Sequence, residues 1–417
     1  MMSNPQVLEV ALYGRRIGTL TLLPGDQTLF VFDQVYVDDH KRPTLSLSFK
    51  DVMGELITDV RRTQTRLPPF FSNLLPEGAL LEYLATKTGF NPRREFFLLW
   101  MLGEDLPGAI TARAADGALP LFAGDGRKVP EEQSQTAAYH FSLAGVQLKF
   151  SGMVHAAGGA TIPAAGVGGS WIIKFPSAVF ARVPENEFAM MELARAIGIN
   201  VPEVRLIPLQ AIQGAPQGLR QQGTQALAVK RFDRTDSGER VHIEDFAQIF
   251  GVYPEKKYER AGYRNLAEVI WLETGESGLT EFIRRLVFNT LIGNGDMHLK
   301  NWSLIYPDKR AAQLSPGYDF VSTIAYLPDE KLALKLGHSK HMTDLGLDEL
   351  AWFAAKARLP ERLVLDTAKE TARRFLEVWN RSQTAEQIDE SVRVKYRGQV
   401  STSNARQNFT GSPQCFS

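Results

Sequence analysis

Cysteine, long apolar runs and net charge are all scarce in this chain of 417 residues. The single cysteine, Cys415, cannot form an internal disulfide, which fits a reducing cytosol. The longest apolar run, residues 96–102, is far shorter than the ~20 residues that cross a bilayer. Lysine plus arginine (47) equals aspartate plus glutamate (47), so the whole chain offers no strong field for nucleic acid or anionic membrane. We therefore expect a soluble, cytoplasmic protein with no membrane role.

Three common catalytic signatures are also missing. No G-x-G-x-x-G loop, no H-E-x-x-H helix and no G-x-S-x-G elbow occurs in the sequence. The histidines are scattered, and the only close pair, His338 and His341, has no cysteine nearby. These absences disfavour a zinc site and Ser/His/Asp chemistry.

The order of expected elements predicts the fold class. Residues 1–113 read as strands (7–13, 17–23, 29–32 and 45–49) followed by helices (77–85 and 93–102), and residues 114–139 as a polar linker. The next block, 140–235, carries strands (147–150, 171–174 and 227–232) and one helix (185–197), and 236–393 is mainly helical, with helices at 279–292 and 367–382. The polar tail, 394–417, is expected to be disordered. We predict an α+β protein with a two-lobed, protein-kinase-like fold, a β-rich N-lobe and a helical C-lobe, preceded by a small α+β domain.

The most informative segment is Leu291–Trp302, which follows an apolar run. It places Asp296, His298, Lys300 and Asn301 within six residues. An Asp with an Asn five positions later is typical of kinases, where the Asp deprotonates the attacking hydroxyl and the Asn helps hold a metal. Asp319 follows about twenty residues on, where a kinase carries its main magnesium ligand. The pattern predicts phosphoryl transfer with ATP and Mg²⁺.

Two lysines are candidates for phosphate contacts. The segment 142–151 has small residues at Ala144 and Gly145 and a cation at Lys149, but its one glycine, taken alone, favours a surface hairpin over a phosphate loop. Lys174 ends an apolar strand, as the phosphate-anchoring lysine of a kinase does, although lysines also commonly decorate strand ends. Glu187 on the next helix is a candidate ion-pair partner for Lys174, and the same helix offers Glu185 and Glu192 as competitors.

The segment 227–234 reads as the last N-lobe strand running into the hinge. Adenine is usually recognised there by backbone groups, for which Lys230 and Phe232 are candidates. Asp233 is a candidate for a ribose hydroxyl, or else for a salt bridge to Arg231 or Arg234.

Several short motifs, in one order from about residue 8 to residue 385, resemble the HipA family of serine/threonine kinases, the toxins of bacterial toxin–antitoxin pairs. They are Pro69–Gly78, Gly103–Ala109, Ser142–Lys149, Ile172–Lys174, Asn186–Phe188, Arg231–Arg234, Ile243–Phe246, Lys257–Glu259, Gly293–Asn301 and Tyr318–Asp319. By this resemblance Asp296 is the catalytic base, Asn301 and Asp319 are magnesium ligands, and Lys174 anchors phosphate. Ser142 matches a site of inhibitory autophosphorylation. The expected ATP site comprises Ala144, Gly145, Val146, Gln147, Leu148, Lys149, Lys174, Lys230, Arg231, Phe232, Asp233, His298, Lys300, Asn301, Tyr318 and Asp319.

The resemblance also implies partners that these residues do not show. They are a helix-turn-helix, HipB-like antitoxin that binds operator DNA, and an aminoacyl-tRNA synthetase as the protein substrate. Contact with DNA mainly through the antitoxin agrees with the balanced charge.

Two other functions stay open at this point. The first is a small-molecule kinase of the aminoglycoside or choline type, although those enzymes place His before the Gly-Asp pair, where this chain has Asn294, and lack a domain like residues 1–110. The second is an inactive co-repressor, although every expected catalytic position is occupied.

Overall fold

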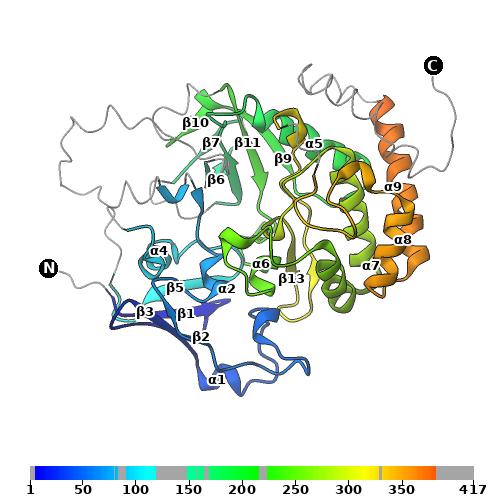
Figure 1. Ribbon diagram of the computed structural model, residues 1–417. Coiled ribbons are helices and arrows are strands. Elements are labelled where there is room, and N and C mark those ends of the chain that lie inside the picture. The colour runs from blue at the N-terminus through cyan, green and yellow to red at the C-terminus, as the bar shows by residue number, and fades with distance from the viewer. Residues whose placement is uncertain are drawn as a thin grey trace.

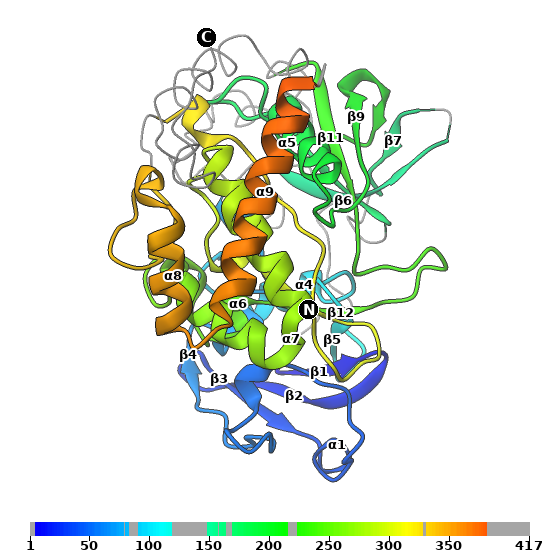
Figure 2. The same ribbon diagram turned by 90° about the vertical axis from the view of Figure 1, so that its right-hand side faces the viewer.

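The computed structural model describes residues 5–78, 80–82, 91–118, 148–156, 158–163, 169–215, 223–327 and 331–381. Figure 1 shows three parts, with the N-terminal strands at the bottom, a second sheet above them and long helices at one side. Figure 2 gives the same arrangement from the helical side. Within the described residues, no helix has the length and apolarity needed to span a membrane.

The N-terminal part is built on an antiparallel sheet with strand order β4-β3-β2-β1-β5. Alternate residues of its strands are buried, as the period of two requires. Its own apolar core includes the almost wholly apolar helix α4, whose residues Phe96 to Met101 are all buried. The elements are β1 (Val7–Leu12), β2 (Arg15–Leu23), β3 (Gln27–Phe32), α1 (Gln34–Val37), η1 (Leu47–Phe49), β4 (Thr63–Gln64), α2 (Pro69–Ser72), α4 (Glu95–Leu102) and β5 (Ile110–Ala114).

One strand expected here is absent. Residues 45–49 alternate in polarity, yet they contain the short 3₁₀ helix η1. The Ser46 hydroxyl accepts a hydrogen bond from Ser48 N and caps this turn, while Ser46 and Leu47 both donate to the carboxylate of Glu244. The contact with Glu244, far away in the sequence, therefore outweighs the local alternation of apolar and polar residues that predicted a strand. Residues 78 and 80–82 of the expected helix 77–85 are helical, and residues 83–90 lie outside the described residues.

The second sheet has the order β10-β7-β6-β8-β11-β9 and packs against α5 (Val183–Ala196), the one helix expected in this block. Its strands are β6 (Lys149–Val154), β7 (Ala160–Thr161), β8 (Trp171–Lys174), β9 (Val204–Pro208), β10 (Ile212–Gln213) and β11 (Gln225–Lys230). In the antiparallel register, Lys149 of β6 lies directly opposite Lys174 of β8.

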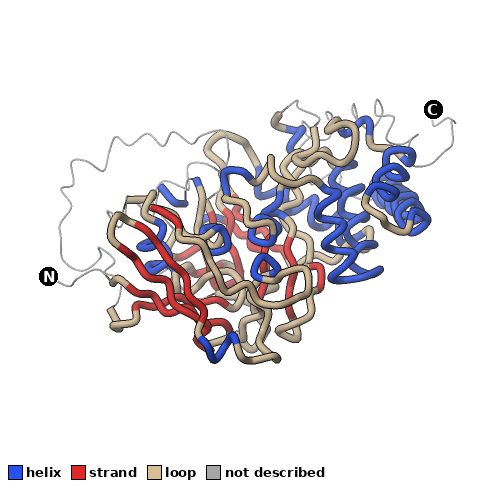
Figure 3. The backbone as a smooth tube through the Cα atoms, turned by 60° about the horizontal axis from the view of Figure 1, so that its bottom comes forward, coloured by secondary structure: helices blue, strands red, loops and turns tan. Residues whose placement is uncertain are grey.

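The rest of the described chain is mainly helical, as expected (Figure 3). It also holds a small antiparallel sheet that the sequence did not predict. Its strands are β12 (His242–Asp245), β13 (Ser303–Tyr306) and β14 (Gln313–Leu314). The helices are α6 (Phe246–Ile249), α7 (Tyr263–Leu291), α8 (Leu347–Lys356) and α9 (Glu361–Arg381), and the chain in α7 breaks helical geometry at Gly275. The strands are short, and β13 is buried along its whole length, so no alternation marks it.

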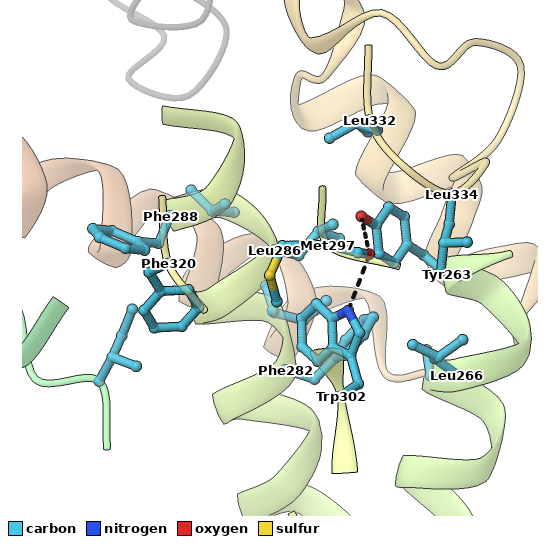
Figure 4. Close-up of a cluster of buried hydrophobic side chains, with 14 of the residues drawn as sticks. Tyr263, Leu266, Phe282, Leu286, Phe288, Met297, Trp302, Phe320, Leu332 and Leu334 are labelled. Atoms are coloured by element: carbon cyan, nitrogen blue, oxygen red, sulfur yellow. Dashed lines mark hydrogen bonds between the residues drawn. The ribbon is translucent and has the colours of Figure 1, made fainter. Parts of the chain in front are cut away.

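The large core of the helical part reaches beneath the segment that follows α7. Phe282 and Leu286 of α7 pack with Trp302 (Figure 4). The Met297 carbonyl oxygen accepts hydrogen bonds from the Tyr263 hydroxyl at 3.1 Å and from Trp302 Nε1 at 3.4 Å. The middle of the segment 291–302 is thereby fixed to the core from below.

Candidate active site

A glycine and an asparagine set the path of the loop that begins where α7 ends. Gly293 has φ of +66°, and a Cβ there would lie 2.3 Å from the Ile324 side chain, so only glycine fits. The buried Asn294 donates to Asn289 Oδ1 at 2.9 Å and to the Asp319 carbonyl at 3.2 Å, and it accepts from Asp296 N at 3.0 Å. Asn294 thus ties the backbone of Asp296 to that of Asp319.

Asp296 lies on this loop with its carboxylate still accessible to solvent. The Tyr258 hydroxyl donates to its Oδ1 at 2.5 Å. Surrounding protein atoms remove hydration and raise the pKa of Asp296, against the opposing effects of the Tyr258 hydrogen bond and the Lys257 charge. A rigidly held, accessible carboxylate of raised pKa is what a general base requires. Asn301 Nδ2 donates to the Asp296 carbonyl at 2.9 Å, which keeps this asparagine beside the base.

Lys174 lies between two acids. Its Nζ is 2.5 Å from Glu187 Oε1 and also forms an ion pair with Asp319 Oδ1. Burial by itself lowers the pKa of Lys174, but the two carboxylates outweigh it and hold the pKa above its ordinary value. The competing acids of α5 are engaged elsewhere, because Glu185 lies 3.9 Å from Arg182 and Glu192 lies 3.2 Å from Arg195.

Lys149 adds a second cation on the same side of the site. Like charges directly opposite each other on paired strands repel, so the Lys149–Lys174 pair needs anionic neighbours. Surrounding protein atoms displace hydration and lower the pKa of Lys149, although the residue is exposed; Lys174 and Lys300 act in the same direction, whereas Asp319 opposes them. Leu148 continues the strand pairing, since its carbonyl accepts from Phe175 N at 2.9 Å. The remaining positions of this expected phosphate loop, Ser142, Ala144, Gly145, Val146 and Gln147, lie outside the described residues.

The hinge residues form a buried ion network with the N-terminal part. Asp233 accepts from Arg231, from Arg234 and from Gly108 N, and both arginines also reach Asp105. Of the two roles predicted for Asp233, the structure shows the salt bridge to Arg231 and Arg234. These contacts occupy the carboxylate that would otherwise bind a ribose hydroxyl. Lys230 pairs with Asp236 at 2.7 Å on the surface, and the Phe232 ring lies 5.7 Å from that of Tyr318. The contacts of Lys230, Arg231, Phe232 and Asp233 with ATP stay predictions.

His298 is buried, and its Nδ1 has no hydrogen-bond partner within the described part of the chain. Burial lowers the pKa of His298 to about 3, so the ring is neutral. It packs edge-on against Tyr258, with ring centroids 4.9 Å apart. Tyr318 has its hydroxyl beneath the loop, where it donates to the Lys300 carbonyl at 2.9 Å. A contact of either residue with ATP stays a prediction.

Lys300 turns away from the kinase residues and toward the N-terminal part. Its Nζ donates to the Asn73 carbonyl at 2.8 Å and to Asn73 Oδ1 at 3.1 Å. It also lies 3.3 Å from Glu77 Oε1 and 3.6 Å from Asp245 Oδ2. Sequence reasoning noted the segments 69–78 and 257–259 as motifs but assigned no role to Asn73, Glu77, Lys257 or Tyr258. Nothing in the local pattern signals that these segments meet.

The residues present fit a magnesium ion. Asp319 supplies a carboxylate, and Asn301 supplies an amide oxygen beside the base. Mg²⁺ prefers such oxygen ligands and takes the rest of its shell from water and phosphate. Asn294 hydrogen-bonds both the Asp319 carbonyl and Asp296 N, so the backbone of the candidate ligand lies close to that of the candidate base.

The structure has a two-lobed, kinase-like fold of the α+β class. Its β-rich lobe carries the Lys174–Glu187 pair, its helical lobe carries the loop with Asp296 and Asn301, and Asp319 lies between the lobes. Comparison with known proteins assigns the family. One family model, described as the HipA-like C-terminal domain, matches residues 141–379, and another, described as the HipA N-terminal domain, matches residues 8–113. The chain therefore belongs to the HipA family.

Individual relatives agree with this assignment. The chain is 54% identical over 385 residues to "Putative kinase Y4dM" of Sinorhizobium fredii, which covers 91% of this chain and 92% of that protein. It is 27% identical over 407 residues to the "Serine/threonine-protein kinase toxin HipA" of Shewanella oneidensis, which covers 88% and 87%. Its fold is similar to a chain in the solved complex of the Shewanella oneidensis toxin–antitoxin system with HipA, HipB and operator DNA. There the TM-score is 0.73, with 23% identity and 97% of both chains covered.

Proposed function

We propose that this protein is an ATP- and Mg²⁺-dependent serine/threonine protein kinase that acts as the growth-inhibiting toxin of a toxin–antitoxin pair. The observation that carries the proposal is the accessible Asp296, fixed on a rigid loop next to Asn301 and the Lys174–Glu187–Asp319 cluster. The names of the relatives support kinase activity. The complex of the similar structure, which contains HipA, HipB and operator DNA, supports a HipB-like antitoxin as partner. We further propose that this chain contacts DNA mainly through that antitoxin.

In this proposal each residue has a defined task. Asp296 accepts the proton of the substrate hydroxyl as the hydroxyl oxygen bonds to the γ-phosphorus and the bond to the ADP oxygen breaks. Lys174, fixed by Glu187, neutralises the phosphates, and Lys149 adds to the positive field. Asn301 and Asp319 would hold Mg²⁺, which supplies further charge neutralisation. In this structure the Tyr258 hydroxyl donates to Asp296 Oδ1, and the incoming hydroxyl would donate to the other carboxylate oxygen, Oδ2.

The deciding experiment is transfer of labelled phosphate from ATP in a bacterial lysate, comparing the protein with Asp296→Asn. The base is lost with almost no change in volume, so transfer should fall by about 10²–10⁴-fold while the fold persists. Identification of the labelled band then tests the expected substrate class, an aminoacyl-tRNA synthetase. Equal labelling by both proteins would contradict the role of Asp296, and a labelled small molecule in place of a protein would favour the small-molecule kinase alternative.

Autophosphorylation at Ser142 is the regulatory part of the proposal. A phosphate there would place about −2 charge next to the phosphate-binding segment and repel ATP. Unphosphorylated protein incubated with ATP and Mg²⁺ should gain the mass of one phosphate, and Ser142→Ala should not. An unchanged mass in the unsubstituted protein would rule out this regulation.

A further inference from the structure

A single acid of the N-terminal part bridges two lysines at the candidate active site. Glu77 Oε2 lies 3.0 Å from Lys257 Nζ, and Glu77 Oε1 lies 3.3 Å from Lys300 Nζ. All three side chains are largely shielded from water, with 25% of Glu77 and 14% of each lysine exposed. Partial burial strengthens such a bridge relative to a surface ion pair.

The two lysines flank the candidate base. Lys257 directly precedes Tyr258, whose hydroxyl donates to Asp296, and Lys300 directly precedes Asn301 on the loop of Asp296. The bridge from Glu77 therefore reaches both the residue that hydrogen-bonds the base and the loop that carries it.

The segment that carries Glu77 is itself firmly attached to the helical part. Helix α2 lies against α6 (Figure 1), and Gln248 Nε2 donates to the Phe70 carbonyl at 3.0 Å. Asn73 Nδ2 donates to the Val252 carbonyl at 2.7 Å. This bond orients Asn73 so that its carbonyl oxygen and its Oδ1 accept from Lys300 Nζ. Lys300 thus meets a preformed group of acceptors from the N-terminal part.

Electrostatics determine the charge state of the bridge. Burial alone would raise the pKa of Glu77, but Lys300 and Lys257 outweigh it and hold the pKa at about 2. Glu77 is therefore ionised at any physiological pH. Without Glu77, Lys257 and Lys300 would lose the carboxylate that they share, while Asp245 would remain 3.6 Å from Lys300.

We propose that Glu77 is a positioning residue, through which the N-terminal domain holds the catalytic loop and the Tyr258 segment in their working arrangement. On this proposal, which rests on the proposed kinase function, residues 69–78 belong to the catalytic unit. A kinase lacking the contact would bind ATP but would transfer phosphate slowly, because the base would no longer be held within hydrogen-bond reach of its substrate.

The test compares Glu77→Gln with Arg66→Gln in the full chain. Arg66 also lies in the N-terminal part and forms an ion pair with Glu255 across the same interface, but it contacts none of the residues around Asp296 that we assign to the site. For each variant, amide hydrogen exchange of residues 293–302, kcat and KM for ATP, and Tm would be measured. Glu77→Gln should speed exchange of 293–302 and lower kcat about tenfold with KM for ATP changed less than about twofold, whereas Arg66→Gln should resemble the unsubstituted protein.

Some outcomes would overturn the proposal. Unchanged exchange of 293–302 in Glu77→Gln would do so, as would a loss of kcat that Arg66→Gln reproduces. In a double-mutant cycle, Lys300→Met added to Glu77→Gln should cost little more than either change alone, and full additivity would show that the two side chains act separately. If the unsubstituted protein transfers no phosphate, the proposed function fails, while the exchange measurement still decides whether Glu77 holds the loop.

Discussion

Lys174 and Lys300 are both lysines of the candidate active site, and both were expected to contact ATP, but they are held in different ways. The partners of Lys174, Glu187 and Asp319, belong to the two lobes of the kinase-like fold. The partners of Lys300 are mainly Asn73 and Glu77 of the N-terminal part. The ammonium of Lys174 bridges the lobes, whereas that of Lys300 joins the helical lobe to another domain. Two lysines of one candidate site are therefore held by different parts of the fold.

The largest effect is expected for Lys174→Met. The substitution leaves the buried carboxylate of Glu187 and the partly buried carboxylate of Asp319 without their shared cation, and breaking a buried ion pair costs about 3–5 kcal/mol of unfolding free energy. It also removes the expected phosphate contact, so transfer from labelled ATP should fall by about 10²–10³-fold. Lys356→Met, at the end of α8 over the Trp352 ring, is the matched control and should alter both quantities little. A stable, active Lys174→Met protein would show that the cluster is only structural.

The second largest effect is expected in the pH dependence of stability, where two acids at the interface with the N-terminal part should behave differently. Glu77 meets lysines, whereas the donors to the buried Glu244 within the described segments are all neutral, namely the Ser46 hydroxyl, Leu47 N and the Tyr306 hydroxyl. Burial outweighs these hydrogen bonds and raises the pKa of Glu244 from 4.5 to about 7. The folded state therefore binds this proton more tightly than the unfolded state, so its contribution to stability is full below about pH 4.5 and is lost as pH rises through about 7.

The expected loss is roughly 3 kcal/mol between pH 4.5 and pH 8. Urea unfolding of the protein and of Glu244→Gln across this range would measure it. The glutamine variant should lack this component of the pH dependence, and parallel curves for both proteins would contradict the assignment.

The smallest effect is expected for Lys300→Met. If Lys300 mainly joins the loop to Asn73 and Glu77, kcat should fall about tenfold, which corresponds to about 1.4 kcal/mol, and KM for ATP should stay within about twofold. Lys174→Met should instead raise KM for ATP strongly. A comparable rise of KM for ATP in both variants would remove this difference between the two lysines and would support the ATP contact predicted for Lys300.

The local spacing of apolar residues in the sequence was enough to predict many of the helices and strands. The strand 171–174 was predicted with its observed bounds, and the helix 185–197 differs from α5 by one or two residues at each end. The strand predicted at 45–49 was wrong, since Glu244 draws Ser46 and Leu47 into a turn. The small sheet that contains β12 was missed, because its short strands carry no clear alternation.

The sequence by itself determined the family, the kinase-like fold class and the candidate base, because the motif from Gly293 to Asn301 keeps its chemistry within one short segment. Only the tertiary structure decided that Asp319 meets Lys174, that Asp105 joins the two arginines around Asp233, and that Glu77 reaches Lys257 and Lys300. The physical reason is range. A period or a motif is set by neighbours a few residues apart, whereas an ion pair between residues more than 170 positions apart depends on how separately formed parts pack together.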